Sequence, residues 1–355
     1  NVGTSDWHRT WTYSPKASRI LFQERRRTQL YHKAHNEPLL PPPSSEWLAI
    51  AIRHNDYDMA CNLIGAGSHM NDVVCKGIIK CPEPWKYVHL FEEIEGLGGY
   101  TTLSLLRFSL KMRAPKDVFS FIFRNIKVIE NDDLDMYGFY YSSNDVRETI
   151  KTFIKYECQR EYFCSFIRKI ENCAFYHGDV FDPLDTGSVL EFTAYSIIMN
   201  NNMCFEILYS VLIRSNDKNR FADTENIHSY LAMMMFDHSR FEMMSAWLDT
   251  GVDVNGCVTI MDDWIYKYKP RVVIVTQQPL SLLSLAVVYY NLIFTSDQTR
   301  VTVNDFLTAC QILIEHGASF HSPDDMGCAP IHYATRLGLI QFLCQGYPDA
   351  LSPIP

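Results

Sequence analysis

Apolar residues along this chain recur mostly at intervals of three and four, the spacing that places side chains on one face of an α-helix. Between residues 47 and 64 this pattern is interrupted at Asn55 and Asp56, which predicts two short antiparallel helices, with Ser44 and Ser45 as capping residues before the first. Similar helical runs occupy residues 101–106, 118–123, 146–177, 189–199, 204–213, 241–248, 280–292 and 304–316. The pattern therefore predicts an all-α chain of helix pairs, in which 146–177 is either a divergent pair or an inserted helical hairpin.

The most regular stretch is 310–338, where the expected end of one helix is followed by the expected start of another. An apolar run containing Leu313 leads to Gly317, a residue suited to the left-handed conformation that stops a helix. Pro330 suits the first turn of the following helix, because its missing N–H costs nothing there. His332 is expected to return a side-chain hydrogen bond to the turn, which makes it a structural rather than a catalytic or metal-binding histidine.

These residues resemble the junction of two ankyrin repeats, where one helix ends in L-L-x-x-G-A and the next begins with D-x-G-x-x-P-L-H-x-A. The chain has C-Q-I-L-I-E-H-G-A at 310–318 and D-M-G-C-A-P-I-H-Y-A at 325–334, closed by Gly338. Similar endings occur at 63–71 (L-I-G-A-G-S-H-M-N) and 247–255 (W-L-D-T-G-V-D-V-N). The resemblance implies an ankyrin-like solenoid over residues 46–355, with about six or seven irregular repeats. It further implies a protein partner bound along the concave face of first helices and projecting loops.

Two long insertions are predicted in this pattern, at 72–100 and 257–279. The second alternates aromatic with basic residues before the strand-like run 272–275, which predicts a β-hairpin. From Gly251 to Gly317 the distance is 66 residues, twice a usual repeat, which favours one greatly expanded repeat over two. Aromatic and arginine side chains on projecting loops are typical binding hot spots, although the same rings also anchor loops on neighbouring repeats. The predicted partner-binding residues are Trp85 and Tyr87 in the first insertion, and Trp264, Tyr266, Tyr268 and Arg271 in the second.

Residues 1–45 form a basic, aromatic arm that ends in a proline-rich linker. Seven Lys or Arg stand against two acidic residues in 1–35, whereas the whole chain has a net charge of −9. The arm is expected either to pack on the first repeat or to dock a partner. The acidic remainder of the chain indicates no general attraction for nucleic acid.

Composition indicates a folded protein, since 47% of residues are hydrophobic and 21% are charged. The 11 cysteines include no C-x-x-C pair, which favours free thiols and a reducing compartment, the cytoplasm or the nucleus. No apolar run is long enough for a membrane span, so we expect no membrane association. Two methionine clusters, at 233–235 and 243–244, have helical spacing that favours the core over an adaptable surface.

Cys158, Cys164, Cys173 and His177 have the residue types of a CCCH zinc finger, a class that binds single-stranded RNA. Their spacing, C-x5-C-x8-C-x3-H, is not the common one, and the intervening apolar residues form a helical stripe. A straight helix would spread residues 158 to 173 over about 22 Å. Cysteines in a helix core are therefore the favoured interpretation, and no metal or cofactor is expected.

No set of catalytic residues stands out. The glycines at 96–99 lack the Lys-Ser/Thr of a phosphate loop, and no H-E-x-x-H or G-x-S-x-G occurs. The sequence thus favours a non-catalytic protein-binding scaffold or adaptor that belongs to a larger complex. The alternatives are an RNA-associated protein that uses the cysteine-histidine group, and a substrate-recognition subunit of a ubiquitin ligase, because residues 339–355 faintly resemble a SOCS box. A regulatory domain attached to an enzyme is a further alternative.

Overall fold

The computed structural model describes residues 44–66, 68, 70–93, 102–126, 143–174, 186–219, 224–256, 258–260, 276–295, 301–321, 323, 327–334 and 340. The chain divides into two compact units, unit 1 at Asn1–Gly178 and unit 2 at Asp179–Pro355. In the described residues the regular elements are helices apart from two short strands, which confirms the all-α prediction. The predicted arm is described only from residue 44, and the first helix begins at Ser45, two residues before its expected start at Trp47.

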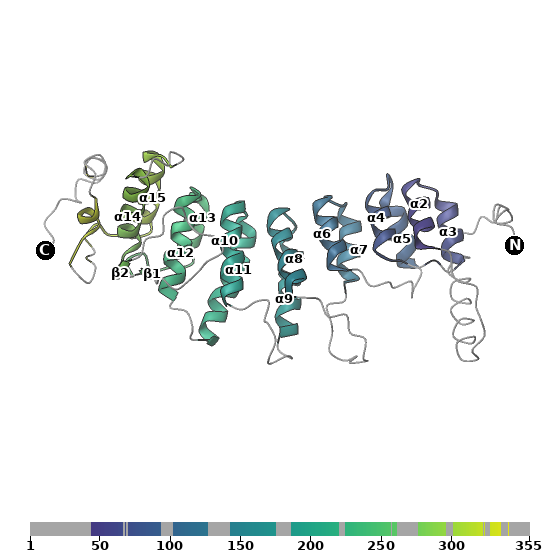
Figure 1. Cartoon of the computed structure of the whole chain (residues 1–355), viewed down its shortest axis with the longest axis horizontal. Helices are drawn as coiled ribbons and strands as arrows, with labels where there is room; N and C mark the ends of the chain where they lie inside the picture. The colour runs from purple at the N-terminus through teal and green to yellow at the C-terminus, as the bar shows by residue number, and fades with distance from the viewer. Residues whose placement is uncertain are drawn as a thin grey trace. The chain divides into compact units, whose positions relative to one another are not determined.

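Unit 1 contains four helix pairs in its described part (Figure 1). The pairs are α2 (Ser45–Arg53) with α3 (Tyr57–Gly65), α4 (Asp72–Ile79) with α5 (Pro84–Glu93), α6 (Leu103–Lys111) with α7 (Lys116–Arg124), and α8 (Ser143–Lys155) with α9 (Arg160–Ala174). The first helices form a row in which α2 packs on α4, α4 on α6 and α6 on α8, and the second helices α5 and α7 also touch. In the last pair, the Phe153 ring of α8 packs against Phe163 and Phe166 of α9.

Unit 2 contains three further pairs and a small hairpin in its described part (Figure 1). The elements are α10 (Thr186–Met199) with α11 (Asn202–Asn219), α12 (Thr224–Asp237) with α13 (Phe241–Leu248), strands β1 (Val258–Ile260) and β2 (Thr276–Leu280), α14 (Leu282–Thr295) with α15 (Val303–Glu315), and the short 3₁₀-helix η2 (Pro330–Tyr333). The first helices α10, α12 and α14 again contact one another in sequence order, and η2 packs on α14.

One tight turn recurs between the helices of four pairs. In each case a residue other than glycine adopts a positive φ, and the next amide donates to the carbonyl five residues earlier. The positive-φ residues are Asn55 (56°), Arg113 (49°), Asn200 (57°) and Ser239 (52°). The corresponding N···O distances are 2.9 Å from Asp56 to Ala51, 3.0 Å from Ala114 to Ser109, 2.9 Å from Asn201 to Ser196 and 2.9 Å from Arg240 to Met235. Both units are thus built from the same supersecondary element.

A second feature recurs where second helices end. Gly251 and Gly317 have φ values of 91° and 92°, and a Cβ at either position would meet no atom within 4 Å, so backbone conformation is what favours glycine there. Beyond each glycine lies the same side-chain turn: Asp253 accepts from the amide two residues on at 3.0 Å, and Ser319 does so at 3.1 Å. The predicted helix-stopping role of both glycines is confirmed.

Side chains also join the ends of successive second helices in unit 2. The Asn255 amide group donates to the Gly317 carbonyl at 2.8 Å and accepts from the Ser319 amide at 3.0 Å. The His316 ring lies 3.2 Å from an Asp249 carboxylate oxygen and 2.8 Å from the Ile312 carbonyl. Equivalent residues of consecutive pairs are therefore held in register.

The positions of Pro330 and His332 around η2 match their predicted roles in the turn. Pro330 occupies the start of η2, and the Ala329 amide donates to Nδ1 of His332 at 2.8 Å. His332 is thus a turn residue, as predicted. The helix that contains it, η2, is only a short 3₁₀-helix in the described residues. Gly338 lies outside the described residues.

The prediction of an insertion at 72–100 is wrong. Residues 72–93 fold as the helix pair α4 and α5, and 94–100 lie outside the described residues. Asn71 caps α4 by accepting from the amides of Val73 and Val74, each at 3.0 Å, and Pro84 starts α5. Residues 80–83 form the short turn between the two helices, and Pro84 and Lys86 belong to α5 rather than to a long loop.

Two antiparallel strands lie at the ends of the segment 257–279, in which the sequence predicts a hairpin. Strand β1 pairs antiparallel with β2, with Val258 opposite Leu280 and Ile260 opposite Thr276. The second strand lies at 276–280, whereas the predicted strand residues 272–275 lie outside the described residues. Only one helix pair, α14 with α15, is described between Gly251 and Gly317, in agreement with a single expanded unit.

Candidate functional site

The side of α2, α4 and α6 that points away from their second helices is exposed. Exposed or half-buried positions recur with a spacing of three and then four residues, as in Trp47, Ile50 and His54 of α2 with its C-cap, and Val73, Lys76 and Lys80 of α4 with its C-cap. In α6, Ser104, Arg107 and Lys111 repeat that spacing. We call this surface the first-helix face and represent it by Trp47, Ile50 and Val73 in its apolar part and by Lys76, Lys80 and Lys111 in its basic part.

The apolar part consists of side chains that are normally buried. Trp47 is 65% exposed, Ile50 40% and Val73 43%, and they are three of the seven exposed large apolar residues in the described part of the chain. The residues beneath them are well packed, since Leu48, Ile52 and the other inward side chains of α2 are buried. Concentration of exposed apolar area over two adjacent helices is typical of a binding surface.

Close packing of α2 on α4 brings the apolar residues together. A Cβ added to Gly77 of α4 would lie 3.0 Å from the Ala49 carbonyl oxygen of α2, closer than real Cβ atoms normally come. Glycine therefore permits this backbone approach, as expected where two chains come very near each other. The two helices that carry Ile50 and Val73 therefore pack closely side by side.

The basic part adjoins the apolar part on α4. The ammonium groups of Lys76 and Lys80 lie 5.7 and 5.8 Å from the centre of the Phe108 ring of α6, within cation–π range. Lys111 is exposed one turn further along α6. None of these three lysines forms an ion pair with another described residue.

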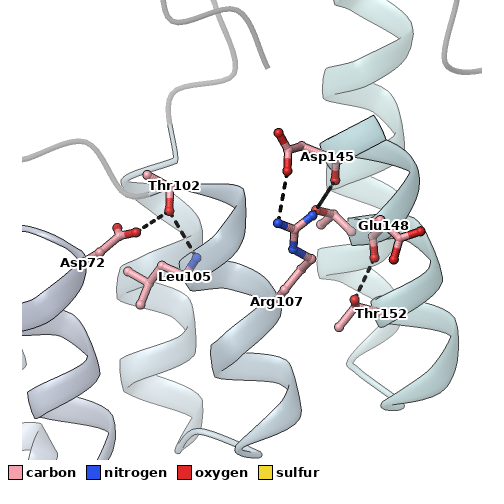
Figure 2. A network of polar contacts seen from close by, with 8 residues as sticks. Asp72, Thr102, Leu105, Arg107, Asp145, Glu148 and Thr152 are labelled. Carbon is pink, nitrogen blue, oxygen red and sulfur yellow. Dashed lines mark hydrogen bonds and ion pairs between the residues drawn. The ribbon is translucent and has the colours of Figure 1, made fainter. Parts of the chain in front are cut away.

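Two other cations of the same helix row, Arg107 and Lys151, are paired with carboxylates. Arg107 of α6 donates to the Asp145 carbonyl at 3.2 Å and to its carboxylate at 3.1 Å, and Figure 2 shows this contact between α6 and α8. Lys151 lies 3.6 Å from the Glu148 carboxylate on the same helix. Arg107 is thus a structural link between neighbouring pairs, in contrast to the lysines of the first-helix face.

The N-termini of the first helices are linked as well (Figure 2). Thr102 caps α6 by accepting from the Leu105 amide at 3.2 Å, and its hydroxyl donates to Asp72 of α4 at 2.5 Å. On α8, the Thr152 hydroxyl donates to the Glu148 carbonyl at 2.7 Å. The Thr102–Asp72 bond joins α6 to α4, and the Arg107–Asp145 contact joins α6 to α8, whereas the Thr152 bond lies within α8.

Trp85 and Tyr87, both predicted to bind a partner, lie on opposite sides of α5. Trp85 is 51% exposed and lies beneath the Lys86 ammonium, whereas Tyr87 is fully buried and its hydroxyl donates to Asn55 at 3.3 Å. Two residues along a helix rotate by about 200°, so a helix at this position can expose only one of the two. The assignment of Tyr87 to a binding surface is therefore wrong, and Tyr87 is a core residue.

The other predicted binding residues, Trp264, Tyr266, Tyr268 and Arg271, lie outside the described residues. The described base of their hairpin packs inward, because β1 contacts α12 and β2 contacts α14. At its base, at least, the hairpin covers first helices of unit 2.

The proposed zinc ligands show a helical arrangement where they are described. Cys164 and Cys173 both belong to α9, and nine residues of helix separate them by about 13 Å along the axis. Cys158 precedes the helix, and His177 lies outside the described residues. In the described part of the chain, no group of three or more Cys, His, Asp or Glu side chains is arranged to hold a metal ion.

The described cysteines are free thiols, most of them buried. Burial raises the pKa of Cys75 and of Cys158 to about 12, and it raises the pKa of Cys310 well above its usual range. Such thiols remain protonated at neutral pH, and the thiolate is the nucleophilic and metal-binding form. They are packing residues, as are the buried methionines 233–235, 243 and 244, whose predicted place in the core is confirmed.

None of the helices in the described residues combines the length and apolar character needed to cross a bilayer. Comparison with known proteins gave no assignment: no family model matches the chain, and no curated protein matches it.

Proposed function

We propose that the chain is a non-catalytic protein-binding scaffold, built from ankyrin-like helix pairs, that holds a protein partner on the first-helix face of unit 1. The observation that carries this proposal is the exposure of Trp47, Ile50 and Val73 over a well-packed core. A scaffold of repeated helix pairs provides a rigid, extended surface of this kind.

The ankyrin-like architecture is supported by three recurring features. Helix pairs stack through their first helices, four pairs share one turn with a positive-φ residue, and two helix ends share the glycine and side-chain turn at Gly251 and Gly317. An experimental structure of the chain tests this part of the proposal. A row of first helices that did not stack in sequence order within each unit would contradict it.

A reducing compartment, the cytoplasm or the nucleus, belongs to the same proposal, since the described cysteines carry no disulfide. Neither the RNA-associated alternative nor the ubiquitin-ligase alternative gains a specific supporting observation. The proposed scaffold role therefore stands as the single candidate.

Site-specific photo-crosslinking tests the binding role. A photoreactive phenylalanine derivative placed at Ile50 is expected to crosslink a protein in the cells that produce the chain, identified by mass spectrometry. The matched control carries the same group at Met59 of α3, which is 38% exposed but lies on a second helix. Labelling of the same proteins from both positions, or of none from Ile50, would contradict the assignment of this face.

A further inference from the structure

The apolar and basic parts of the first-helix face form one surface. Val73 and Lys76 are three residues apart on α4 and therefore lie on the same side of that helix. Lys80 and Lys111 extend this side toward the ends of α4 and α6. A ligand that covers Ile50 and Val73 can therefore also contact these lysines.

The positive charge of this surface is local. The whole chain has a net charge of −9, yet the face has Lys76, Lys80 and Lys111 with no ion pair to another described residue. Arg53 of α2 is also exposed beside it, and its Nε donates to the Ala49 carbonyl at 3.3 Å rather than to a carboxylate. The face thus presents cations that a ligand can neutralise.

We propose that the first-helix face binds an acidic segment of a partner protein, with an apolar anchor packed against Trp47, Ile50 and Val73 and carboxylates paired with Lys76, Lys80 and Lys111. This proposal rests on the proposed function and adds the chemistry of the partner. Buried apolar anchors supply affinity, while the surrounding charges select the partner and speed its approach.

Other classes of ligand match the first-helix face less well. A second copy presenting the same face would place lysine against lysine, and residues 1–35 of the chain have seven basic and two acidic residues, so they repel this surface. A nucleic acid would pair with the lysines and would find one ring for base stacking, Trp47, but it would gain little from Ile50 and Val73, which are aliphatic. The combination of aliphatic anchors with cations is best matched by an acidic peptide.

The test is a selection of random 16-residue peptides, displayed on messenger RNA, against the immobilised full chain, followed by affinity measurements on selected peptides by fluorescence anisotropy. The expected peptides have a net negative charge and at least one large aliphatic or aromatic residue. Raising the salt from about 50 to 500 mM is expected to weaken their binding, because exposed charges are screened.

Matched variants locate the site. Lys80→Glu is expected to weaken binding about tenfold, whereas Lys116→Glu, on an exposed position of α7 away from the face, makes the same change in net charge with little effect. Ile50→Ala is expected to weaken binding, and Met59→Ala is its control. Circular dichroism of each variant establishes that the helices are intact.

The outcomes separate this inference from the proposed function. Selected peptides that are neutral or basic, or that respond equally to Lys80→Glu and Lys116→Glu, would overturn the acidic-partner inference while crosslinking from Ile50 still supported a protein-binding face. Tight binding of a 30-nucleotide single-stranded RNA that is lost in Lys80→Glu and competes with the peptides would also overturn it. Failure of both the selection and the crosslinking would remove both proposals.

Discussion

The first helices of unit 1 and those of unit 2 share a turn and a packing mode but differ in what covers their other side. In α2 and α4 the side away from the second helices is open, with Trp47 65% exposed. In α12 every described side chain from Ile227 to Asp237 is buried except His228, which is half-buried. In α14 the residues from Leu282 to Ile293 are buried apart from Val288 and Leu292.

The hairpin accounts for part of this difference. Strand β1 contacts α12, and β2 together with η2 contacts α14. An element that in unit 1 offers a surface is thus part of the core in unit 2, because residues from elsewhere in the chain cover it. The same helix pair thus exposes or buries one side of its first helix, depending on what lies over that helix.

The largest effect on stability is expected from removing a buried ring of unit 2. Phe236 of α12 is fully buried, with ring centres 5.9 Å from Tyr289 and 5.8 Å from Tyr290. Phe236→Ala is expected to lower the free energy of unfolding by about 3–5 kcal/mol, whereas Trp47→Ala is expected to change it by less than about 0.5 kcal/mol. Urea unfolding followed by circular dichroism measures both, and equal losses would break the comparison.

A pH-dependent loss of stability is expected from unit 2. Burial lowers the pKa of His228 to about 4, and its Nε2 lies 3.0 Å from the Tyr209 hydroxyl. The unfolded chain protonates this histidine near pH 6.5, whereas the folded chain protonates it only near pH 4. The contribution of the neutral histidine to the free energy of unfolding is therefore fully present above pH 6.5 and is lost as the pH falls toward 4. The loss amounts to about 3 kcal/mol.

Unfolding at pH 7 and pH 5 measures this effect. The variant His228→Gln is expected to lose less stability than the unaltered chain between these two values. Carboxylate titration is common to both proteins, so the difference isolates the histidine. An identical pH dependence of the two proteins would contradict the assignment.

A smaller difference in stability loss is expected between two variants that each remove one polar side-chain contact. The Tyr289 hydroxyl donates to buried Asp237 at 2.7 Å, whereas the Arg107–Asp145 pair of unit 1 is partly exposed. Tyr289→Phe is expected to cost about 1–3 kcal/mol, and Arg107→Ala no more than about 1 kcal/mol. Chemical unfolding of both variants checks the order, and a larger loss for Arg107→Ala would reverse it.

The smallest effect on stability is expected at the positive-φ turn that both units share. Arg113→Gly in unit 1 and Ser239→Gly in unit 2 each relieve a positive φ, so each is expected to raise stability by about 0.5 kcal/mol. Glu242→Gly, at an exposed position inside α13, is the control and is expected to cost about 1 kcal/mol. Thermal unfolding measures all three, and a loss at both turns would show that the shared geometry is not strained.

Sequence reasoning succeeded where a helix is amphipathic and ends at a glycine. The predicted helix at 241–248 matches α13, and Gly251 follows it in the left-handed conformation. It did not predict α12, in which nearly all described side chains are buried and apolar and polar positions do not alternate, although the similarly buried α14 was predicted at 280–292. It also missed α4, although Asn71 stands as a capping residue before Val73 and Val74.

The candidate surface was hidden for a related reason. Ile50 belongs to the apolar run 48–52, in which buried and exposed residues have the same character, so nothing local distinguishes Ile50 from Leu48 or Ile52. The spacing of Trp47, Ile50 and His54 could have indicated a separate side of the helix.

The sequence by itself determined the local conformations: the capping residues, the left-handed glycines and the amphipathic helices, all of which depend on a few neighbouring residues. The tertiary structure decided which side of each first helix is covered. That choice depends on residues far apart in the chain, such as β1 against α12, and burial is a property of the neighbours in space rather than of the helix itself. Trp47 is exposed and Phe236 is buried against Tyr289 and Tyr290, although both are large aromatic residues on first helices.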